Sequence, residues 1–251
     1  MSDDAPAPAS GPSGFRTRLT GGDDLTGLVV RTPSHQVVEV LAATMQPDVV
    51  MLDTEHAAFD PGVLDATIAV ARGLGVPTLV RVPELSRPAF QQPLDMGSTG
   101  VVVPHVRTAD DAAAAVRLAH YGDGGRGYSG STRSAGWGRR SMAEVVAAAA
   151  ATTTVIVQVE DPAAVDEASA IAATPGVDAV FVGAADLAVA MGARSVADEA
   201  VQRACTSVIG ACRRAGIAVV AFAGSAEDAA AWRSRGVSCV LQGTDQARLA
   251  G

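Results

Sequence analysis

Two stretches decide the fold class: Val155-Ile156-Val157-Gln158-Val159-Glu160 and Ala179-Val180-Phe181-Val182-Gly183-Ala184-Ala185-Asp186. Each is a short apolar run rich in β-branched residues, with a carboxylate at or just past its end. A helical pattern from Pro162 to Ala172 follows the first stretch. This alternation predicts buried parallel strands joined by crossover helices.

Similar strand-like runs recur along the chain, and helical patterns lie between most of them. Such β/α units in one chain predict an α/β protein with a (β/α)8 TIM barrel, formed by a single domain over residues 15–251. An open doubly wound sheet is the competing architecture, but no GxGxxG motif follows the first strand. The predicted strands are Gly27–Arg31, Val49–Asp53, Thr78–Val82, Gly100–Pro104, Val155–Glu160, Ala179–Gly183, Ala218–Ala221 and Cys239–Leu241.

Helix boundaries are marked by capping residues. Asp60 and Pro61 suit the N-cap and the first position of a helix, and Thr108 with Asp111 forms a capping box. Pro93 lies inside the helical pattern Pro88–Met96 and is expected to kink or shorten that helix. The other clear helical patterns are His35–Met45, Val196–Ala215 and Ser225–Arg235.

The composition excludes several classes of protein. The 251 residues are 48% hydrophobic, enough for a large core, and no apolar run is long enough for a membrane span. A net charge of -8 argues against nucleic acid or an anionic membrane as a partner. Residues 1–14 resemble a disordered tail rather than a signal peptide. Three scattered cysteines indicate buried thiols in a reducing compartment, which predicts a cytoplasmic protein.

The sequence contains no lysine, because all 19 basic residues are arginine. A GC-rich genome would explain part of this bias. The chemical consequence is that no lysine can form a Schiff base with a carbonyl substrate. Carbanion chemistry in this chain would need another electron sink, and a metal ion is the obvious one.

Carboxylates and an amide mark the ends of the two opening stretches. The carboxyl ends of parallel strands face one ligand crevice, so Gln158, Glu160 and Asp186 are expected to converge there. Two carboxylate ligands with room for water suit Mg²⁺ or Mn²⁺, and such a site also accepts Co²⁺. Alternatively, Glu160 and Asp186 only stabilise the starts of the following helices.

Other charged residues lie at the ends of the second and third predicted strands. Asp53 and His56 are close enough for the carboxylate to orient the imidazole as a general base, although a capped turn would look the same. Arg81 stands between apolar residues and would hold a carboxylate or an enolate oxygen, unless it forms a buried ion pair. His105 is a weaker candidate than His56.

The segment Gly122–Gly138 is long, irregular and rich in glycine. Long irregular loops in compact domains are usually functional. It contains no Walker motif, so it is not a phosphate-binding P-loop. We expect specificity for a second substrate to lie in this segment and in neighbouring subunits.

Seven short motifs, in this order along the chain, resemble the HpcH/HpaI aldolase family. The resemblance runs from about Leu25 to Leu241. The motifs are Leu52-Asp53-Thr54-Glu55-His56-Ala57, Leu79-Val80-Arg81-Val82-Pro83, Leu94-Asp95-Met96-Gly97, Val103-Pro104, Arg126-Gly127, Val157-Gln158-Val159-Glu160 and Phe181-Val182-Gly183-Ala184-Ala185-Asp186-Leu187.

The resemblance implies a (β/α)8 barrel and a class II, divalent-metal pyruvate aldolase. Such an enzyme reversibly cleaves a 4-hydroxy-2-oxo acid into a 2-oxo acid, pyruvate or hydroxypyruvate, and an aldehyde. It also implies a homo-oligomer, trimer or hexamer, whose subunits exchange a C-terminal helix. This chain ends at Gly251, soon after the last predicted strand, so we expect a short last helix and leave the exchange and the hexamer open.

The resemblance also implies roles for single residues. Glu160 and Asp186 would bind the metal, and Gln158 would lie beside it. Arg81 would contact the oxo acid and its enolate, His56 supported by Asp53 would be the base, and Asp95 would reach the neighbouring subunit's site. In Gly183-Ala184-Ala185-Asp186 the backbone would hold the substrate carboxylate; members commonly have Gly-Pro-Ala-Asp there, and the change puts the loop's geometry in doubt.

Two other functions fit parts of this pattern. A lyase acting on acyl-CoA esters, like the citrate-lyase β relatives, uses a similar barrel and charged residues. A barrel without catalysis, acting as a binding or assembly protein, would have little physical reason to keep unpaired charges such as Glu160, Asp186, Arg81 and His56 in its mouth.

Overall fold

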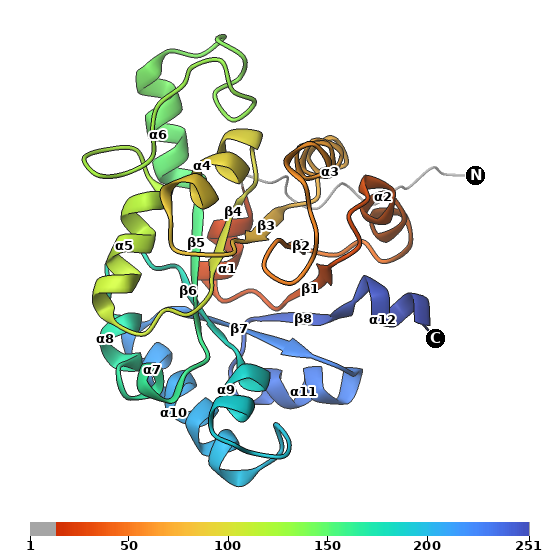
Figure 1. Ribbon diagram of the computed structural model, residues 1–251, viewed down its shortest axis with the longest axis vertical. Coiled ribbons are helices and arrows are strands. Elements are labelled where there is room, and N and C mark those ends of the chain that lie inside the picture. The colour runs from red at the N-terminus through yellow and green to blue at the C-terminus, as the bar shows by residue number, and fades with distance from the viewer. Residues whose placement is uncertain (1–13, 251) are drawn as a thin grey trace.

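The protein is a (β/α)8 barrel, as the sequence predicts. The structure is a computed structural model that describes residues 14–250. Its strands pair in parallel in chain order, and the last strand pairs with the first (Figure 1). In this described part the strands are β1 (Leu25–Val30), β2 (Val49–Asp53), β3 (Thr78–Arg81), β4 (Gly100–Val103), β5 (Thr154–Val159), β6 (Ala179–Val182), β7 (Ala218–Ala223) and β8 (Cys239–Thr244).

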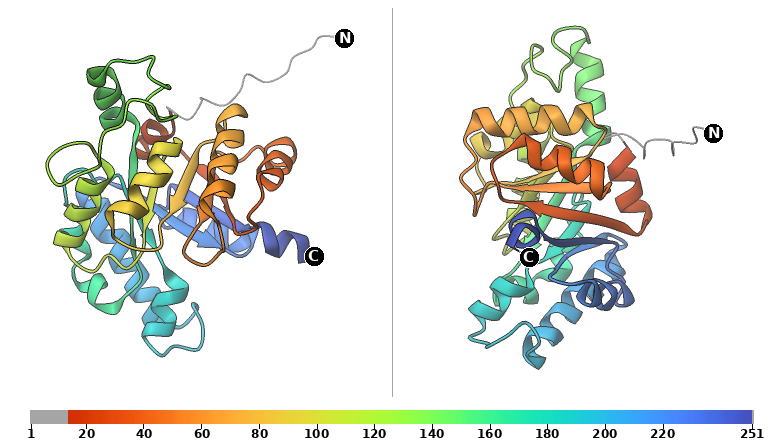
Figure 2. Two further views of the ribbon diagram at one scale, coloured as in Figure 1. Left: turned by 45° about the horizontal axis from the view of Figure 1, so that its top comes forward. Right: turned by 90° about the vertical axis from the view of Figure 1, so that its right-hand side faces the viewer.

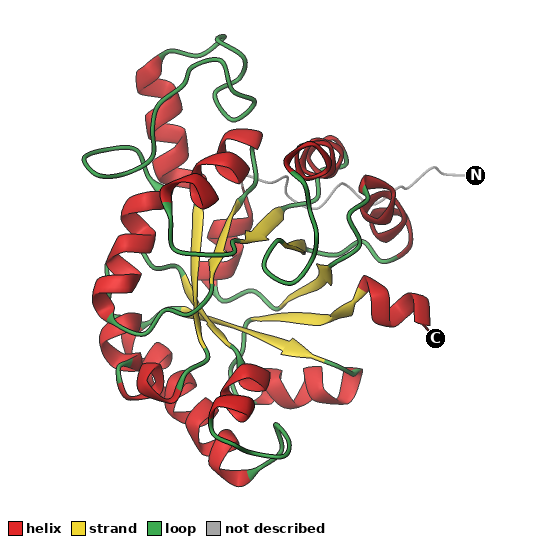
Figure 3. Ribbon diagram, viewed as in Figure 1, coloured by secondary structure: helices red, strands yellow, loops and turns green. Residues whose placement is uncertain are grey.

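Helices surround the barrel on its outer side (Figures 2 and 3). The outward residues of the strands pack against them, such as Val157 and Val180 in one cluster with Ile171. The helices within residues 14–250 are α1 (Phe15–Gly21), α2 (His35–Thr44), α3 (Pro61–Gly73), α4 (Arg87–Met96), α5 (Ala109–Ala119), α6 (Met142–Thr152), α7 (Pro162–Asp166), α8 (Ala168–Ala172), α9 (Ala184–Ala190), α10 (Glu199–Ala215), α11 (Ala226–Ser234) and α12 (Asp245–Ala250).

The barrel interior is a separate apolar cluster to which every strand contributes. Phe15 and Leu19 of α1 belong to the same cluster and are 1% and 0% exposed. Arg16 bonds Asp178, just before β6, with Nε and Oδ1 2.8 Å apart. Helix α1 therefore closes the barrel at the N-terminal ends of its strands, and each of its two apolar side chains contributes about 1.5–3 kcal/mol by burial.

Two helix starts follow the predicted capping chemistry. Asp60 Oδ1 accepts hydrogen bonds from the backbone N–H groups of Gly62 and Val63, at 2.8 and 3.0 Å. Thr108 and Asp111 form the capping box at the start of α5. These caps satisfy backbone donors that the first turn of a helix leaves without partners.

Some predicted helix boundaries were wrong. Helix α4 begins at Arg87 rather than Pro88 and continues through Pro93 to Met96, so Pro93 does not shorten it, while the predicted kink stays a prediction. The pattern Pro162–Ala172 divides into α7 and α8, because Glu167 has φ -88° and ψ 0° and ends one helix as it begins the next. Helix α10 begins at Glu199 rather than Val196.

The predicted disordered tail, residues 1–14, lies outside the described residues except for Gly14. Among the helices described, none combines the length and the apolar character needed to cross a membrane.

Candidate active site

The inward-facing side chains of the barrel change from apolar to polar at the C-terminal ends of the strands. Val29, Met51, Leu79 and Ile156 belong to the interior cluster. Side chains two positions apart on a strand share one face, so the next inward residues of these four chain segments lie over the barrel mouth. These residues are Arg31, Asp53, Arg81 and Gln158.

Asp53 and Arg81 form a buried ion pair. They lie opposite each other in the register of β2 and β3. Arg81 donates Nε to Oδ1 at 3.0 Å and Nη2 to Oδ2 at 2.6 Å, and Arg31 donates Nε to Oδ2 at 2.8 Å. Burial opposes ionisation of Asp53, but the hydrogen bonds and charges of the arginines outweigh it and keep the pKa below its ordinary value. The Asp53 carboxylate is therefore ionised at neutral pH.

The predicted pairing of Asp53 with the imidazole of His56 is wrong. Asp53 Oδ1 accepts a hydrogen bond from the backbone N–H of His56 at 3.2 Å, while both carboxylate oxygens are already bound to arginine. The ring of His56 instead lies 3.8 Å, Nε2 to Oε2, from Glu55 and is 52% exposed. His56 is thus a rim residue whose nearest carboxylate is Glu55.

Glu55, to which the sequence assigned no role, connects several charged groups. Its Oε2 lies 3.2 Å from Nε of Arg81, and its Oε1 lies 3.3 Å from Nε2 of His105. The carboxylate is only 11% exposed. His105, ranked below His56 in the sequence, therefore contacts this charged group of side chains too, although its own side chain is 59% exposed.

The predicted metal ligands Glu160 and Asp186 come together with Gln158. Gln158 donates a side-chain hydrogen bond to Glu160 Oε2. The pKa of Glu160 is raised above its ordinary value, mainly by burial and further by the negative charge of Asp186. The backbone hydrogen bond and charge of His105 and the hydrogen bond from Gln158 lower this pKa but do not outweigh burial. Geometrically, Gly183 lies against both Glu160 and Gln158 and directly precedes α9, whose first turn carries Asp186.

Gly183 allows this close packing. An added Cβ there would lie 2.6 Å from Cβ of Glu160 and 3.2 Å from Nε2 of Gln158. Its φ is -80°, so space rather than backbone conformation excludes a larger residue. Gly183 thereby fixes how closely the start of α9 approaches the end of β5.

A cavity of about 560 Å³ opens at the barrel mouth. It brings together most of the predicted substrate and metal residues with Arg31, which sequence reasoning missed. Arg31 could have been found from the inward alternation of β1, because it lies two positions after Val29. The predicted residues that line this cavity are Arg81, Gln158, Gly183, Ala184, Ala185 and Asp186.

The donor set at the mouth fits a hard divalent cation. Two repelling carboxylates would be neutralised by a cation, and Mg²⁺ typically takes one or two protein carboxylates and completes its shell with water or substrate oxygens. Among the described residues, the buried Gln158 Oε1 has no hydrogen-bond partner and is available to a water of such a shell. No set of three or more His, Cys, Asp or Glu side chains in residues 14–250 is arranged to hold a metal, so water and substrate would supply the other ligands.

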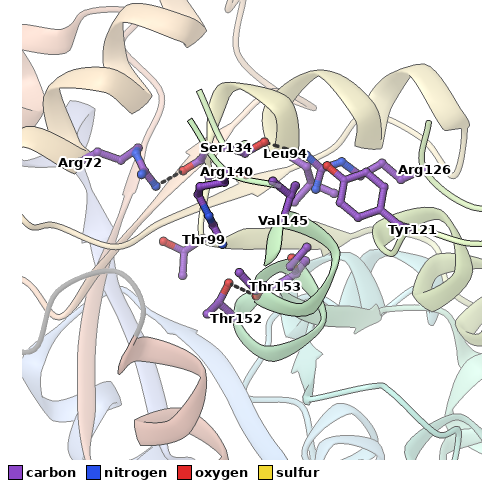
Figure 4. Close-up of a pocket in the computed structure, with 14 residues that line it drawn as sticks. Arg72, Leu94, Thr99, Tyr121, Arg126, Ser134, Arg140, Val145, Thr152 and Thr153 are labelled. Carbon is purple, nitrogen blue, oxygen red and sulfur yellow. Dashed lines mark hydrogen bonds between the residues drawn. The ribbon is translucent and has the colours of Figure 1, made fainter. Parts of the chain in front are cut away.

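Asp95 and the segment Gly122–Gly138 lie away from the mouth cavity of their own chain. Asp95 accepts a hydrogen bond from Nη2 of Arg126 at 2.7 Å. The irregular segment lines a second cavity of about 380 Å³ beside α6, where Arg126 packs over the ring of Tyr121 (Figure 4). Residues 122–138 therefore contribute nothing to the mouth of this chain, and specificity exerted across a subunit interface stays a prediction.

Comparison with known proteins gives matches over nearly the whole chain. A family model described as HpcH/HpaI aldolase/citrate lyase matches residues 26–250. A hydroxypyruvate/pyruvate aldolase of Paraburkholderia phytofirmans is 35% identical over 239 residues, which cover 92% of this chain and 91% of the relative. A 5-keto-4-deoxy-D-glucarate aldolase of Klebsiella pneumoniae is 34% identical over 200 residues, covering 79% and 77%.

Solved structures agree with these sequence matches. The crystal structure of a protein of the same family from Burkholderia cenocepacia has a TM-score of 0.89 and 35% sequence identity to this chain. The match covers 95% of both chains. The barrel fold is thus shared with that protein over almost the whole chain.

Proposed function

Because the chain belongs to the HpcH/HpaI aldolase/citrate lyase family, we propose that it is a metal-dependent aldolase acting on 4-hydroxy-2-oxo acids. Its products are pyruvate, or a related 2-oxo acid such as hydroxypyruvate, and an aldehyde. The observation that carries this proposal is the cavity at the barrel mouth, because Arg81, Gln158 and Asp186 all line it. A fixed cation and a metal-binding carboxylate are the two groups that an enolate-forming reaction needs.

The metal belongs to the proposal as well. Glu160 and Asp186 would hold a Mg²⁺, Mn²⁺ or Co²⁺ ion, which as a Lewis acid polarises the keto group of the 2-oxo acid. The absence of lysine from the sequence leaves no side chain for the Schiff-base alternative. The chain's own residues would then bind and orient the substrate and move its protons.

Arg81 is suited to stabilise the negative charge that develops on the keto oxygen. Its guanidinium is 6% exposed and is held in place by two hydrogen bonds to Asp53. A donor fixed in this way needs no reorganisation when charge develops, and a site shielded from water strengthens its effect. Asp53 therefore serves as the residue that positions Arg81.

The substrate carboxylate would lie at the start of α9. Ala184 and Ala185 line the mouth cavity, and the first N–H groups of a helix have no intrahelical acceptor. Ala184 replaces a residue that is commonly proline in the family, so this chain has one additional backbone N–H in the loop. The carboxylate would be oriented by backbone donors rather than by a second arginine.

Proton transfer at the aldol hydroxyl is assigned to His56. Its exposed ring at the rim suits the second substrate, which enters from solvent, and Glu55 rather than Asp53 is the carboxylate beside the ring. The imidazole would accept the proton of the C4 hydroxyl during cleavage and return it during aldol addition.

The test combines proton exchange with trapping. The protein with bound metal should exchange the C3 protons of pyruvate with ²H₂O, which NMR detects, and should release pyruvate from 4-hydroxy-2-oxo acids. EDTA should abolish both activities and Mn²⁺ should restore them, whereas pyruvate with borohydride should leave activity intact. Full activity after chelation, or inactivation by borohydride, would disprove the metal mechanism. An acyl-CoA ester in the same substrate panel tests the lyase alternative, and neither reaction is expected of a barrel that only binds ligands.

A further inference from the structure

His105 contacts the carboxylates of two other segments at once. Its backbone N–H donates to Glu160 Oε1 at 2.7 Å, and its ring Nδ1 lies 2.9 Å from the same oxygen. The other ring nitrogen, Nε2, lies 3.3 Å from Glu55 Oε1. One imidazole thus joins the end of β5 to the loop after β2.

The backbone of His105 adopts a conformation that residues other than glycine rarely adopt. Its φ is +56°, in the left-handed region, directly after Pro104 at the end of β4. Such a conformation persists when surrounding contacts determine it, and it is typical of functional sites. Here it directs both the N–H and the ring Nδ1 of one residue to a single oxygen of Glu160.

The contacts of His105 extend to the arginine proposed to bind substrate. Glu55 Oε2 lies 3.2 Å from Nε of Arg81, and Arg81 in turn holds Asp53. His105 therefore closes a continuous series of charged contacts from Glu160 to Arg81. The only direct link of this series to Glu160 among the described residues is His105, since Gln158 approaches from the strand of Glu160 itself.

We propose that His105 is a positioning residue, which holds Glu160 for the metal and couples the metal site to Arg81 through Glu55. This inference rests on the proposed function. Residues that hydrogen-bond to metal ligands orient them, and losing such a partner typically weakens metal affinity by about 10–100-fold. The coupling means that metal and 2-oxo acid are bound by one frame of side chains rather than by two independent sites.

The first test separates the ring of His105 from its backbone. His105→Gly keeps the left-handed backbone and the N–H donor to Glu160 but removes the imidazole. The dissociation constant for Mn²⁺, measured by electron paramagnetic resonance on the full-length protein, should rise about 10–100-fold. Calorimetry with pyruvate at saturating Mn²⁺ should show weaker binding too. His105→Asn also keeps this backbone conformation accessible and should weaken Mn²⁺ binding in the same direction.

The control is His35→Gly, which removes an exposed imidazole at the first position of α2. It should leave Mn²⁺ and pyruvate binding at the wild-type values. Melting temperatures and circular dichroism of all variants show whether each one folds. If His105→Gly and His105→Asn fold and bind Mn²⁺ with wild-type affinity, the proposal is overturned.

A double-mutant cycle tests the coupling itself. Glu55→Gln should weaken Mn²⁺ binding in the wild-type background, because the ring of His105 loses its second carboxylate. In the His105→Gly background the same change should have no further effect, because the connecting ring is already absent. Additive effects would show that Glu55 and His105 act separately and would refute the coupling.

These results are distinguishable from failure of the proposed function. If wild-type protein binds no Mn²⁺ and catalyses no pyruvate exchange, the aldolase proposal itself fails. If wild-type protein binds Mn²⁺ and catalyses pyruvate exchange, and the His105 variants bind Mn²⁺ and pyruvate as tightly as wild type, the aldolase proposal stands and the role of His105 is refuted.

Discussion

Arg81 and Asp53 face each other across the register of β3 and β2 and are joined by two hydrogen bonds, from Nε to Oδ1 at 3.0 Å and from Nη2 to Oδ2 at 2.6 Å. A lysine ammonium is a point charge and cannot reproduce this planar pairing. Arg81→Lys should therefore slow both pyruvate C3 exchange and aldol cleavage by about 10²–10³-fold, the loss typical for one preorganised charge-stabilising group. NMR exchange and a pyruvate-coupled assay measure the two rates. If the lysine variant keeps both rates within a few-fold, a point charge is sufficient and the planar pairing is not needed; if Arg81→Ala also keeps full exchange, the arginine acts only as a structural ion-pair partner.

His56→Ala should separate the two half-reactions. The ring lies at the rim beside Glu55 and is proposed to act on the aldol hydroxyl, not on the C3 proton of pyruvate. Cleavage should fall by about 10²–10⁴-fold, the usual contribution of a general acid–base group, while pyruvate exchange stays near the wild-type rate. Both assays are run at saturating metal. Unchanged cleavage would assign the proton transfer to another group, with Glu55 the next candidate.

Asp53 should make stability depend on pH in the acid range. Its pKa is lowered in the folded protein, because Arg81 and Arg31 outweigh the effect of burial. The stabilisation is therefore complete above the ordinary aspartate pKa of about 3.9 and is lost as pH falls through the lower folded value. Asp53→Asn should cost about 3–5 kcal/mol at pH 7, since it leaves Arg81 buried without its main anion, and its stability should change less between pH 5 and pH 3.

Urea unfolding at several pH values measures this difference. Asp60→Asn is the matched control, because asparagine caps a helix about as well as aspartate at that exposed position. A parallel pH dependence in wild type and Asp53→Asn would contradict the assignment.

Gly183→Ala should damage the carboxylate pair without straining the backbone. The new Cβ would lie 2.6 Å from Cβ of Glu160, so one of the two must move. Overpacking of this kind typically costs about 1–3 kcal/mol, and the displaced carboxylate should bind Mn²⁺ more weakly. Gly73→Ala is the control, because no atom other than the nearby backbone of α3 itself lies within 4 Å of the corresponding Cβ. Wild-type Mn²⁺ affinity in Gly183→Ala would show that Glu160 is not confined there.

Asp95 offers a test of shared sites. It lies on α4, bound to Arg126 rather than to any group at its own mouth. If the protein is a trimer or hexamer in which Asp95 reaches the neighbouring site, mixing Asp95→Ala with Arg81→Ala subunits should restore part of the activity. Light scattering gives the oligomeric state, and tagged subunits confirm exchange. Confirmed exchange without any recovery would refute a shared site.

The strands and the carboxylates at their ends could be read from the sequence, because each buried strand is a continuous apolar run and Glu160 directly follows one. The side chain that pairs with Asp53 could not be predicted from the sequence. Nearness in sequence favoured His56, whereas the parallel register of β2 and β3 places Arg81 opposite. Parallel pairing joins residues that are distant in sequence, so it becomes visible only when the strands are aligned.

Helix α6 was not predicted, for a different reason. Its run of alanines and its single fully buried residue, Val145, give no amphipathic pattern, although Ser141 and Glu144 form a capping box that does mark its start. The left-handed backbone of His105 was equally invisible, because the contacts with Glu160 and Glu55 impose it from other segments.

The α1 helix that closes the barrel has a consequence for how the chain is made. Phe15 and Leu19 are synthesised long before Cys239 and Leu241 of β8, which belong to the cluster that buries them. The first strand likewise pairs with β8. Neither α1 nor β1 can reach its final contacts until β8 has been synthesised, and such long-range pairing slows folding. We therefore expect nascent chains that lack β8 to expose an apolar N-terminal helix and to be substrates for chaperones.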